Sequence, residues 1–202
     1  IAMFENHVNF HKQTASKIYD IPLEEVTKEQ RRAAKAINFG IIYGMSAWGL
    51  SESIGINPND ASIYIEKYFQ TFHKVKEYLD NVVLEAKKDG YTKTIFNRRR
   101  YIPEINSTNK ALASFGERTA MNSPIQGSAA DIIKLAMNKV SKRMQGMKSV
   151  MIAQVHDELL FDVDENEVLK LEQIVKEEME NVVKLLVPLV VEIGTGKNWL
   201  EA

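Results

Sequence analysis

Positions 31–44 read RRAAKAINFGIIYG, and the interpretation of the chain depends on this segment. Residues four apart lie on one face of an α-helix. Two cations and then two aromatic rings follow this spacing: Arg31, Lys35, Phe39 and Tyr43. The alanines and isoleucines between them lie on the other side and can pack on a core. Such a stripe suits a molecule with a polyphosphate at one end and a flat base at the other.

Local signals predict where this helix begins and ends. Thr27 followed by Gln30 has the pattern of a capping box, so we expect a helix over 27–44. Gly40 weakens the helix by about 1 kcal/mol relative to alanine, but it lets a base or a backbone approach closely. Gly44 can end the helix. The alternative is an ordinary amphipathic helix with a solvated basic face and two rings in the core.

The composition is that of a globular protein, with 45% hydrophobic and 26% charged residues among 202. Cysteine is absent, which excludes a disulfide framework, a thiolate metal site and a cysteine nucleophile. No apolar run reaches the roughly 18 residues of a membrane span, so we expect no membrane partner.

The net charge of −1 hides an asymmetry along the chain. Residues 157–202 contain four lysines and twelve acidic residues, a balance of −8, so the other 156 residues carry +7. A split of this kind is typical of proteins that contact nucleic acid or polyphosphate. The alternative explanation is a solvated acidic helix beside a mildly basic domain.

Periodicity and capping signals predict an α+β fold. Besides 27–44, we expect helices at residues 61–72, 74–89, 110–122, 124–144 and 165–187. The pair Ser123-Pro124 is typical of a helix start and separates two of these helices. We also expect hairpins at 91–103 and 149–163, and a last strand at 189–193. The predicted fold is a mostly helical part to residue 107, then helices packed with a small antiparallel sheet.

The first predicted hairpin carries four positive charges: Lys93, Arg98, Arg99 and Arg100. We expect these cations to contact the phosphates of DNA without base preference. A solvated basic turn is the alternative, because runs of charge commonly form solvated faces.

Three segments, in this order, resemble family A DNA polymerases of the bacterial DNA polymerase I type. The spacing Arg31-x3-Lys35-x3-Phe39-Gly40-x2-Tyr43-Gly44 is similar to the fingers-helix motif of that family. The second segment is ERTAMNSPIQGSAAD at 117–131, and the third is QVHDEL at 154–159. The resemblance covers essentially the whole chain.

The resemblance implies a division into two parts. Residues 1–107 would be the fingers subdomain, with the nucleotide-binding helix at 27–44 and the basic hairpin at 91–103. Residues 108–202 would be the C-terminal part of the palm, with the third motif on the hairpin at 149–163.

The resemblance also assigns roles to single residues. It implies that the incoming nucleotide is bound by Arg31, Lys35, Phe39, Tyr43 and His11. Lys35 would also be catalytic, because it would neutralise charge that develops on the phosphates.

Contacts with primer and template are implied for Arg118, Asn122, Gln126 and His156. The amides among them can pair with the acceptors that every base pair shows in the minor groove, and so check geometry without reading sequence.

The third motif implies a metal site. Asp157 would be a catalytic Mg²⁺ ligand, and Glu158 would lie close to the metal and count among the catalytic residues. Two Mg²⁺ ions are implied, and the second aspartate ligand is expected to lie outside this chain. From the residues alone, an exposed acidic turn is the alternative at this position.

The function implied for the intact parent is template-directed DNA synthesis with primer-template DNA and dNTPs, in the bacterial cytoplasm. The chain is expected to be a fragment of a monomeric enzyme that also needs the thumb and the N-terminal palm. By itself the fragment is expected to be inactive. The alternative function is a non-catalytic helical module that binds nucleic acid.

Overall fold

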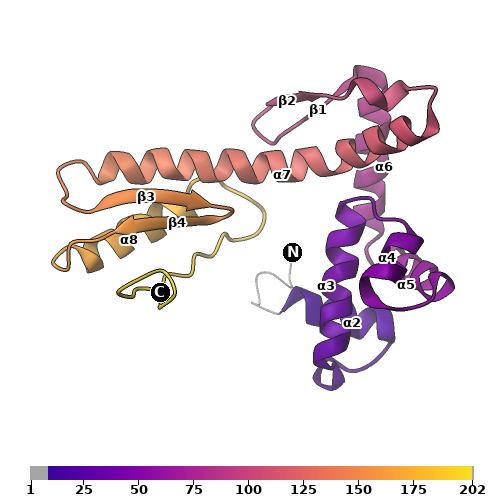
Figure 1. Ribbon diagram of the computed structural model, residues 1–202, viewed down its shortest axis with the longest axis horizontal. Coiled ribbons are helices and arrows are strands. Elements are labelled where there is room, and N and C mark those ends of the chain that lie inside the picture. Colours follow the sequence, from indigo (N-terminus) through magenta and orange to yellow (C-terminus); the bar gives the residue numbers. More distant parts are fainter. Residues whose placement is uncertain (1–8, 202) are drawn as a thin grey trace. The chain divides into compact units, whose positions relative to one another are not determined.

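The structure, a computed structural model, describes residues 9–201 (Figure 1). The chain divides into two compact units, one up to Ser128 and one from Ala129 onward. We call them the N-terminal unit and the C-terminal unit and describe each by itself. Within the described residues no helix is both long and apolar enough to cross a membrane.

The N-terminal unit is mainly helical. Its elements are α2 (Phe10–Tyr19), α3 (Lys28–Ile42), α4 (Ala47–Ile54), α5 (Pro58–Thr71), α6 (His73–Asp89), β1 (Tyr91–Lys93), β2 (Arg99–Tyr101), the 3₁₀ helix η2 (Pro103–Asn106) and the first part of α7 (Lys110–Arg143). A short 3₁₀ helix, η1 (Leu23–Glu25), joins α2 to α3.

The predicted capping signals are confirmed where α3 and α6 begin or end. Thr27 Oγ1 accepts from the backbone N–H of Gln30 at 3.2 Å, and Gln30 Oε1 accepts from that of Thr27 at 2.9 Å. This reciprocal pair satisfies two donors that the first turn of α3 leaves unpaired. Gly90 ends α6 with a positive φ of 76°, which glycine adopts without strain.

Two apolar clusters hold the N-terminal unit together. The larger one is formed by buried residues of α2 to α6: Ile18, Ile37, Ile41, Leu50, Ala61, Tyr68 and Leu79. The smaller one joins α6, η2 and α7 through Ala86, Ile102, Ile105 and Ala120. Because α3 packs two isoleucines into the larger cluster, its opposite face is open to solvent.

The C-terminal unit packs the second part of α7 against a hairpin and a helix. Strand β3 (Val150–Val155) pairs antiparallel with β4 (Glu158–Asp162), and α8 (Val168–Glu180) follows. The apolar cluster of this unit is formed by buried residues of α7, the turn after it and α8: Val140, Met144, Leu171, Ile174 and Val175.

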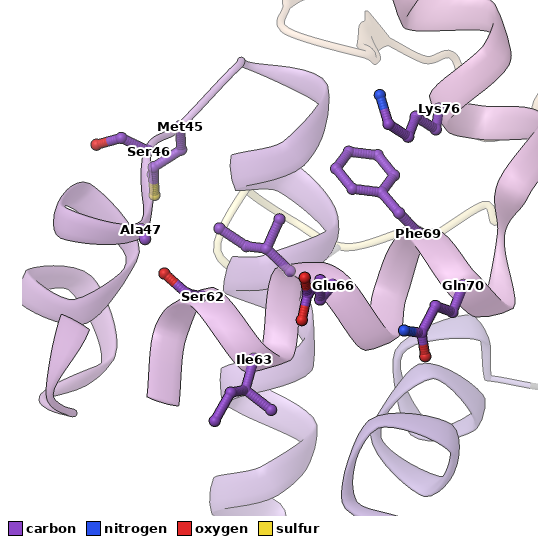
Figure 2. A pocket seen from close by; sticks show the side chains of 10 residues that line it. Met45, Ser46, Ala47, Ser62, Ile63, Glu66, Phe69, Gln70 and Lys76 are labelled. Atoms are coloured by element: carbon purple, nitrogen blue, oxygen red, sulfur yellow. The ribbon is translucent and has the colours of Figure 1, made fainter. Parts of the chain in front are cut away.

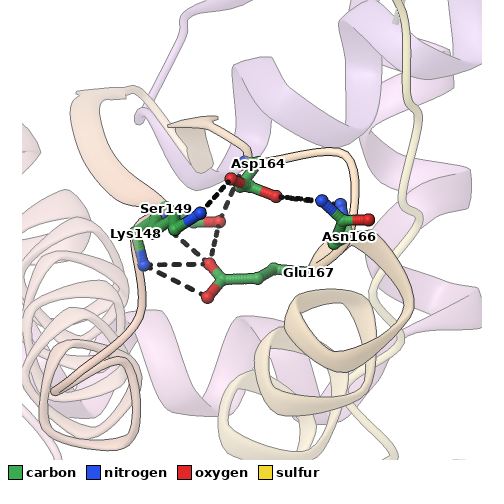
Figure 3. Close-up of polar contacts among 5 residues, drawn as sticks. All are labelled: Lys148, Ser149, Asp164, Asn166 and Glu167. Atoms are coloured by element: carbon green, nitrogen blue, oxygen red, sulfur yellow. Dashed lines mark hydrogen bonds and ion pairs between the residues drawn. The ribbon is translucent and has the colours of Figure 1, made fainter.

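A set of polar contacts ties the start of β3 to the start of α8 (Figure 3). The Glu167 carboxylate accepts from the backbone N–H groups of Lys148 and Ser149 and from the Ser149 hydroxyl, at 2.7 to 3.1 Å. These bonds hold the pKa of Glu167 below its ordinary value of 4.5. The hairpin that carries the third motif is therefore fixed at its base.

Four predicted elements differ from the structure. The two helices predicted at 110–122 and 124–144 are one helix, α7, with Pro124 inside it. Ser123 does not cap a helix there, because its hydroxyl donates to the Thr119 carbonyl at 2.6 Å. Packing on both sides of Pro124, by Ala120 in one cluster and Val140 in another, offsets the missing proline N–H.

The other two differences lie near the C-terminus. The helix predicted at 165–187 is shorter, since α8 ends at Glu180 and the Asn181 side chain donates to the Glu177 carbonyl. The strand predicted at 189–193 does not form. A strand needs a ladder partner, and in the described part of the chain β3 and β4 pair only with each other.

Candidate functional site

The predicted stripe on α3, which we call the α3 stripe, is exposed along its whole length. Arg31 and Lys35 are exposed, and Phe39 and Tyr43 are 45% and 40% exposed. The Phe39 and Tyr43 rings are nearly parallel, with centroids 6.5 Å apart. Lys35 Nζ lies 5.9 Å from the centre of the Phe39 ring. The alternative that placed both rings in the core is wrong, because the core face of α3 is formed by other residues.

His11 lies beside this stripe on α2. Its ring centroid is 5.8 Å from that of Phe39. Partial burial, and then the charges of Lys35 and Arg31, lower the pKa of His11 from its ordinary value of 6.5. Arg31, Lys35 and the His11 ring thus lie near one another where α2 approaches α3, an arrangement that can bind a polyphosphate.

Sequence reasoning missed the residue that positions His11. Asn38 is buried, and its Nδ2 lies 2.9 Å from His11 Nδ1. If Asn38 donates this hydrogen bond, His11 is neutral at Nδ1 and carries its proton on Nε2. The Asn38 amide also bonds the buried Thr14 hydroxyl at 3.2 Å. The available signal was an amide on the apolar face of α3, a position where a buried polar group needs partners.

A second missed contact involves Asn9. Its Oδ1 accepts from the backbone N–H of Lys12 at 3.0 Å and so caps α2. The same oxygen is 3.4 Å from Arg31 Nε. Asn9 therefore links the start of the helix that carries His11 to the cationic end of the α3 stripe.

The aromatic end of the α3 stripe touches the second motif. Gln126 Nε2 lies 3.2 Å from the Tyr43 hydroxyl, although the two residues are 83 positions apart. Gly44 has a φ of +65°, and a Cβ on it would lie 2.9 Å from Arg118 Cγ. Only glycine accepts both this backbone conformation and this approach of α7. Within the N-terminal unit, the first two predicted motifs therefore lie together.

Met45 completes the turn that follows α3. Its backbone N–H donates to the Gly40 carbonyl at 2.8 Å. A Cβ on Gly40 would lie 3.0 Å from Met45 Sδ, and one on Gly49 would lie 3.0 Å from Met45 Cγ. The Met45 side chain thus fills the space that two glycines leave open.

The remaining predicted residues of the second motif are also accessible in part. Arg118 is exposed and donates to the Ser114 hydroxyl at 2.8 Å. The Asn122 Oδ1 atom is buried and has no hydrogen-bond partner among the described residues. Leaving a buried acceptor unpaired costs about 1–3 kcal/mol, a cost that is common at sites built for a ligand.

The three arginines of the first hairpin, Arg98, Arg99 and Arg100, are exposed. The hairpin is anchored to α7, since the Ile95 N–H donates to the Ser128 hydroxyl at 3.0 Å. It therefore lies next to the segment of α7 that carries Gln126.

The third motif occupies the tip of the β3–β4 hairpin in the C-terminal unit. His156, Asp157 and Glu158 are all exposed. His156 has a φ of +54°, a conformation that a non-glycine residue adopts at some cost. This conformation continues the chain from β3 through Asp157 into Glu158, where β4 begins. Two adjacent carboxylates are thus held at a fixed tip, where their oxygens can bind a cation.

The described residues do not form a complete metal site by themselves. Across residues 9–201, no three His, Asp, Glu or Cys side chains gather closely enough to hold a metal ion. Asp157 and Glu158 can therefore supply only part of a ligand set.

An open groove of about 640 Å³ lies between the start of α4 and helices α5 and α6 (Figure 2). Met45, Glu66, Phe69 and Lys76 contribute to its lining. None of the predicted nucleotide-binding or DNA-binding residues lines it. The α3 stripe is therefore an exposed helix surface outside this groove.

Comparisons with known proteins place this geometry in a family. Residues 1–201 match the family described as DNA polymerase family A. The chain is 52% identical to DNA polymerase I of Caldicellulosiruptor bescii and 46% identical to that of Bacillus subtilis, in both cases over its full length. It covers 24% and 23% of these two proteins, so it spans about a quarter of the curated relatives it matches.

A solved structure is similar as well. It is the POL domain of Pol1 from M. smegmatis in complex with DNA primer-template and dNTP. The TM-score is 0.94 and the identity is 46%, over 98% of this chain and 35% of that one.

Proposed function

The chain belongs to DNA polymerase family A, and we propose that it is the fingers and C-terminal palm of an enzyme that performs template-directed DNA synthesis. The reaction would add deoxynucleoside monophosphates to a primer 3′ end and release pyrophosphate. The observation that carries the proposal is the contact between Gln126 and Tyr43, which joins two polymerase-like motifs at one place.

In this proposal the α3 stripe binds the incoming dNTP. Lys35 would neutralise charge that develops on the phosphates in the transition state. Arg31 and His11 would bind the outer phosphates, Phe39 would pack on the sugar, and Tyr43 would guard the base-pair site. The support is that these side chains are accessible and that the cations and the rings occupy separate ends of one helix face.

Primer-template DNA would be contacted from α7, the first hairpin and the third motif. We assign Arg118, Asn122 and Gln126 to the bases and backbone near the primer end, and His156 to the primer end itself. Arg98, Arg99 and Arg100 would contact phosphates. The Oδ1 atom of Asn122 has no hydrogen-bond partner among the described residues, which supports the assignment of this amide to a DNA contact.

Asp157 would be the Mg²⁺ ligand of this chain, and Glu158 would lie beside the ion. The exposed carboxylates at the hairpin tip fit such an ion, because Mg²⁺ prefers oxygen donors and keeps several waters. When bound, a pair of Mg²⁺ ions stabilises both the attacking and the leaving oxygen. We propose that the second aspartate belongs to the rest of the polymerase, since the described residues lack a complete ligand set.

The rest of the proposal concerns the whole protein. We propose that it is a monomeric bacterial enzyme of the cytoplasm, that it acts in DNA replication and repair, and that the thumb and N-terminal palm complete its site. The lengths of the two polymerases, about four times that of this chain, support only the part of this proposal that concerns further subdomains.

The test is Asp157→Ala in the intact parent polymerase. Primer extension should be abolished, while affinity for primer-template DNA stays nearly unchanged, because the aspartate is needed for metal rather than for DNA. Asp162→Ala, at the far end of the same hairpin, is the matched control and should extend primers normally. Wild-type extension by Asp157→Ala would contradict the assignment. DNA binding by the unmodified parent without any templated addition would favour the alternative, a non-catalytic binding module.

A further inference from the structure

One face of the β1–β2 hairpin combines aromatic rings with cations. In the antiparallel register Tyr91 pairs with Tyr101, and Lys93 pairs with Arg99. Side chains alternate between the two faces of a strand, so these four lie on one face and Arg100 lies on the other. We call the face with the two tyrosines the hairpin platform.

The side chains of the hairpin platform hold one another in place. The Tyr91 and Tyr101 rings meet edge to face, with centroids 5.6 Å apart. The guanidinium carbon of Arg99 lies 4.7 Å from the centre of the Tyr91 ring, and Lys93 Nζ lies 5.4 Å from it. A hydrogen bond with the Tyr101 side chain is the main cause that raises the pKa of Arg99. Planar groups and charges are thus arranged before any ligand arrives.

This arrangement is unfavourable for the hairpin alone. Like charges directly opposite each other destabilise a strand pair, and Lys93 faces Arg99 in this way. Among the ion pairs between described residues none includes either cation, although the charge of Asp89 contributes to the raised pKa of Arg99. Tyr101 is 67% exposed. An anionic ligand with a flat ring would both separate the two charges and cover the tyrosine.

The hairpin platform is joined to the proposed DNA site. The Ile95 N–H donates to the Ser128 hydroxyl, and a Cβ on Gly127 would lie only 2.7 Å from Thr94 Cγ2. This close packing fixes the hairpin against the turn of α7 that carries Gln126. Thr92 and Thr94 are buried on the side that packs on α7, so the hairpin platform lies on the opposite face of the same hairpin, open to solvent.

We propose that the hairpin platform binds the unpaired part of the template strand, with one base stacked on Tyr101 and the backbone phosphates beside Lys93 and Arg99. The proposal rests on the proposed polymerase function. Single-stranded DNA offers a flat base and an anionic backbone together, and stacking on aromatic and guanidinium groups is how proteins bind it without sequence preference. An acidic protein would satisfy the cations but leave the exposed ring uncovered.

The experiment compares three primer-templates bound by the intact parent polymerase at one salt concentration: a blunt duplex, the same duplex with a template 5′ overhang of six thymidines, and one with six abasic sites in the overhang. Fluorescence anisotropy gives each Kd. Wild type should bind the duplex with the thymidine overhang more tightly than the blunt duplex. Tyr101→Leu should raise the Kd for the overhang duplex roughly 5- to 150-fold, the range expected for one stacked base. Tyr101→Phe, which keeps the ring, should retain most of the gain.

Each result has one meaning. If the parent binds none of the duplexes, the polymerase function itself fails. If it binds the blunt duplex but gains nothing from the overhang, or if Tyr101→Leu keeps the gain, the platform proposal is overturned and the polymerase function stands. An equal gain from the abasic overhang would overturn stacking in favour of charge alone. A duplex with an unpaired 5′ flap on the non-template strand tests which strand the platform binds. If Tyr101 tightens binding of this flap but not of the template overhang, the assignment of the template strand to the platform is overturned.

Discussion

Lys35 and Arg31 lie one turn apart on α3, yet we expect them to affect different steps. Lys35→Ala in the intact parent should lower the maximal rate of nucleotide addition, because the lost charge is needed most in the transition state. One such contact in a closed site is worth on the order of 2–4 kcal/mol, or about 30- to 1000-fold. Arg31→Ala should weaken nucleotide binding and lower the rate as well. Single-turnover kinetics across nucleotide concentrations separate the two effects.

Arg32→Ala provides the control for both variants. Arg32 is exposed on the same helix but does not lie on the α3 stripe, so its loss should leave both parameters near wild type. Wild-type rates for Lys35→Ala would remove that residue from the proposed site.

His11 predicts a pH dependence of stability. Its folded-state pKa lies below its ordinary value of 6.5, so the unfolded chain binds the proton more readily than the folded chain. The contribution to stability is then present above pH 6.5 and is lost as the pH falls through the folded-state pKa. We expect the unfolding temperature of the chain to drop between pH 7.5 and pH 5, and His11→Gln to reduce that drop.

The control is His73→Gln, since His73 is an exposed histidine at the start of α6. This variant should keep the pH dependence of wild type. An unchanged drop in His11→Gln would mean that burial and the charges of Lys35 and Arg31 do not favour the neutral imidazole.

At the scale of elements, the packing of α7 on η2 depends on Gly116. A Cβ there would lie 2.7 Å from the Ile105 Cα and 2.8 Å from the Ile105 backbone nitrogen. Alanine is the better helix former by about 1 kcal/mol. Even so, Gly116→Ala should lower the free energy of unfolding by about 1–3 kcal/mol, because a backbone segment rather than a side chain must move. Chemical denaturation measures this change.

Gly49→Ala is the matched control in α4. There the nearest atom to an added Cβ is Met45 Cγ, at 3.0 Å, which belongs to a flexible side chain. We expect this change to be close to neutral, and an equal loss in both variants would contradict the role given to the η2 backbone.

The elements that could be predicted from the sequence are those set by local chemistry. The capping box at Thr27 and the glycine after Asp89 determine helix ends with a few neighbouring atoms, and both predictions are confirmed. The pair Ser123-Pro124 predicts a helix start, but α7 continues through Pro124, because the packing that supports it there comes from residues distant in sequence. The α3 stripe could be predicted from spacing alone. The role of Asn38 could not, since its partners His11 and Thr14 are more than 20 residues away.

At the scale of the whole molecule, we expect that the 202-residue chain without the rest of the parent polymerase does not extend a primer. Two-metal catalysis needs ions about 4 Å apart that share carboxylates, and no three potential metal ligands gather among the described residues. We expect weak DNA binding at low salt and no extension with Mg²⁺ or Mn²⁺. A primer-extension assay on the purified chain decides this. Templated addition that disappears in Asp157→Ala would show that no further carboxylate is needed.

Met45 makes the end of α3 vulnerable to peroxide. Its thioether rests against Gly40 and lines the open groove, so an oxidant can reach it. Sulfoxide formation would add a polar oxygen to a sulfur that already packs closely on Gly40. The damage would fall within two residues of Tyr43, at the aromatic end of the α3 stripe. Oxidation of the enzyme should therefore lower its affinity for nucleotides before its affinity for DNA. Met45→Leu should delay this loss.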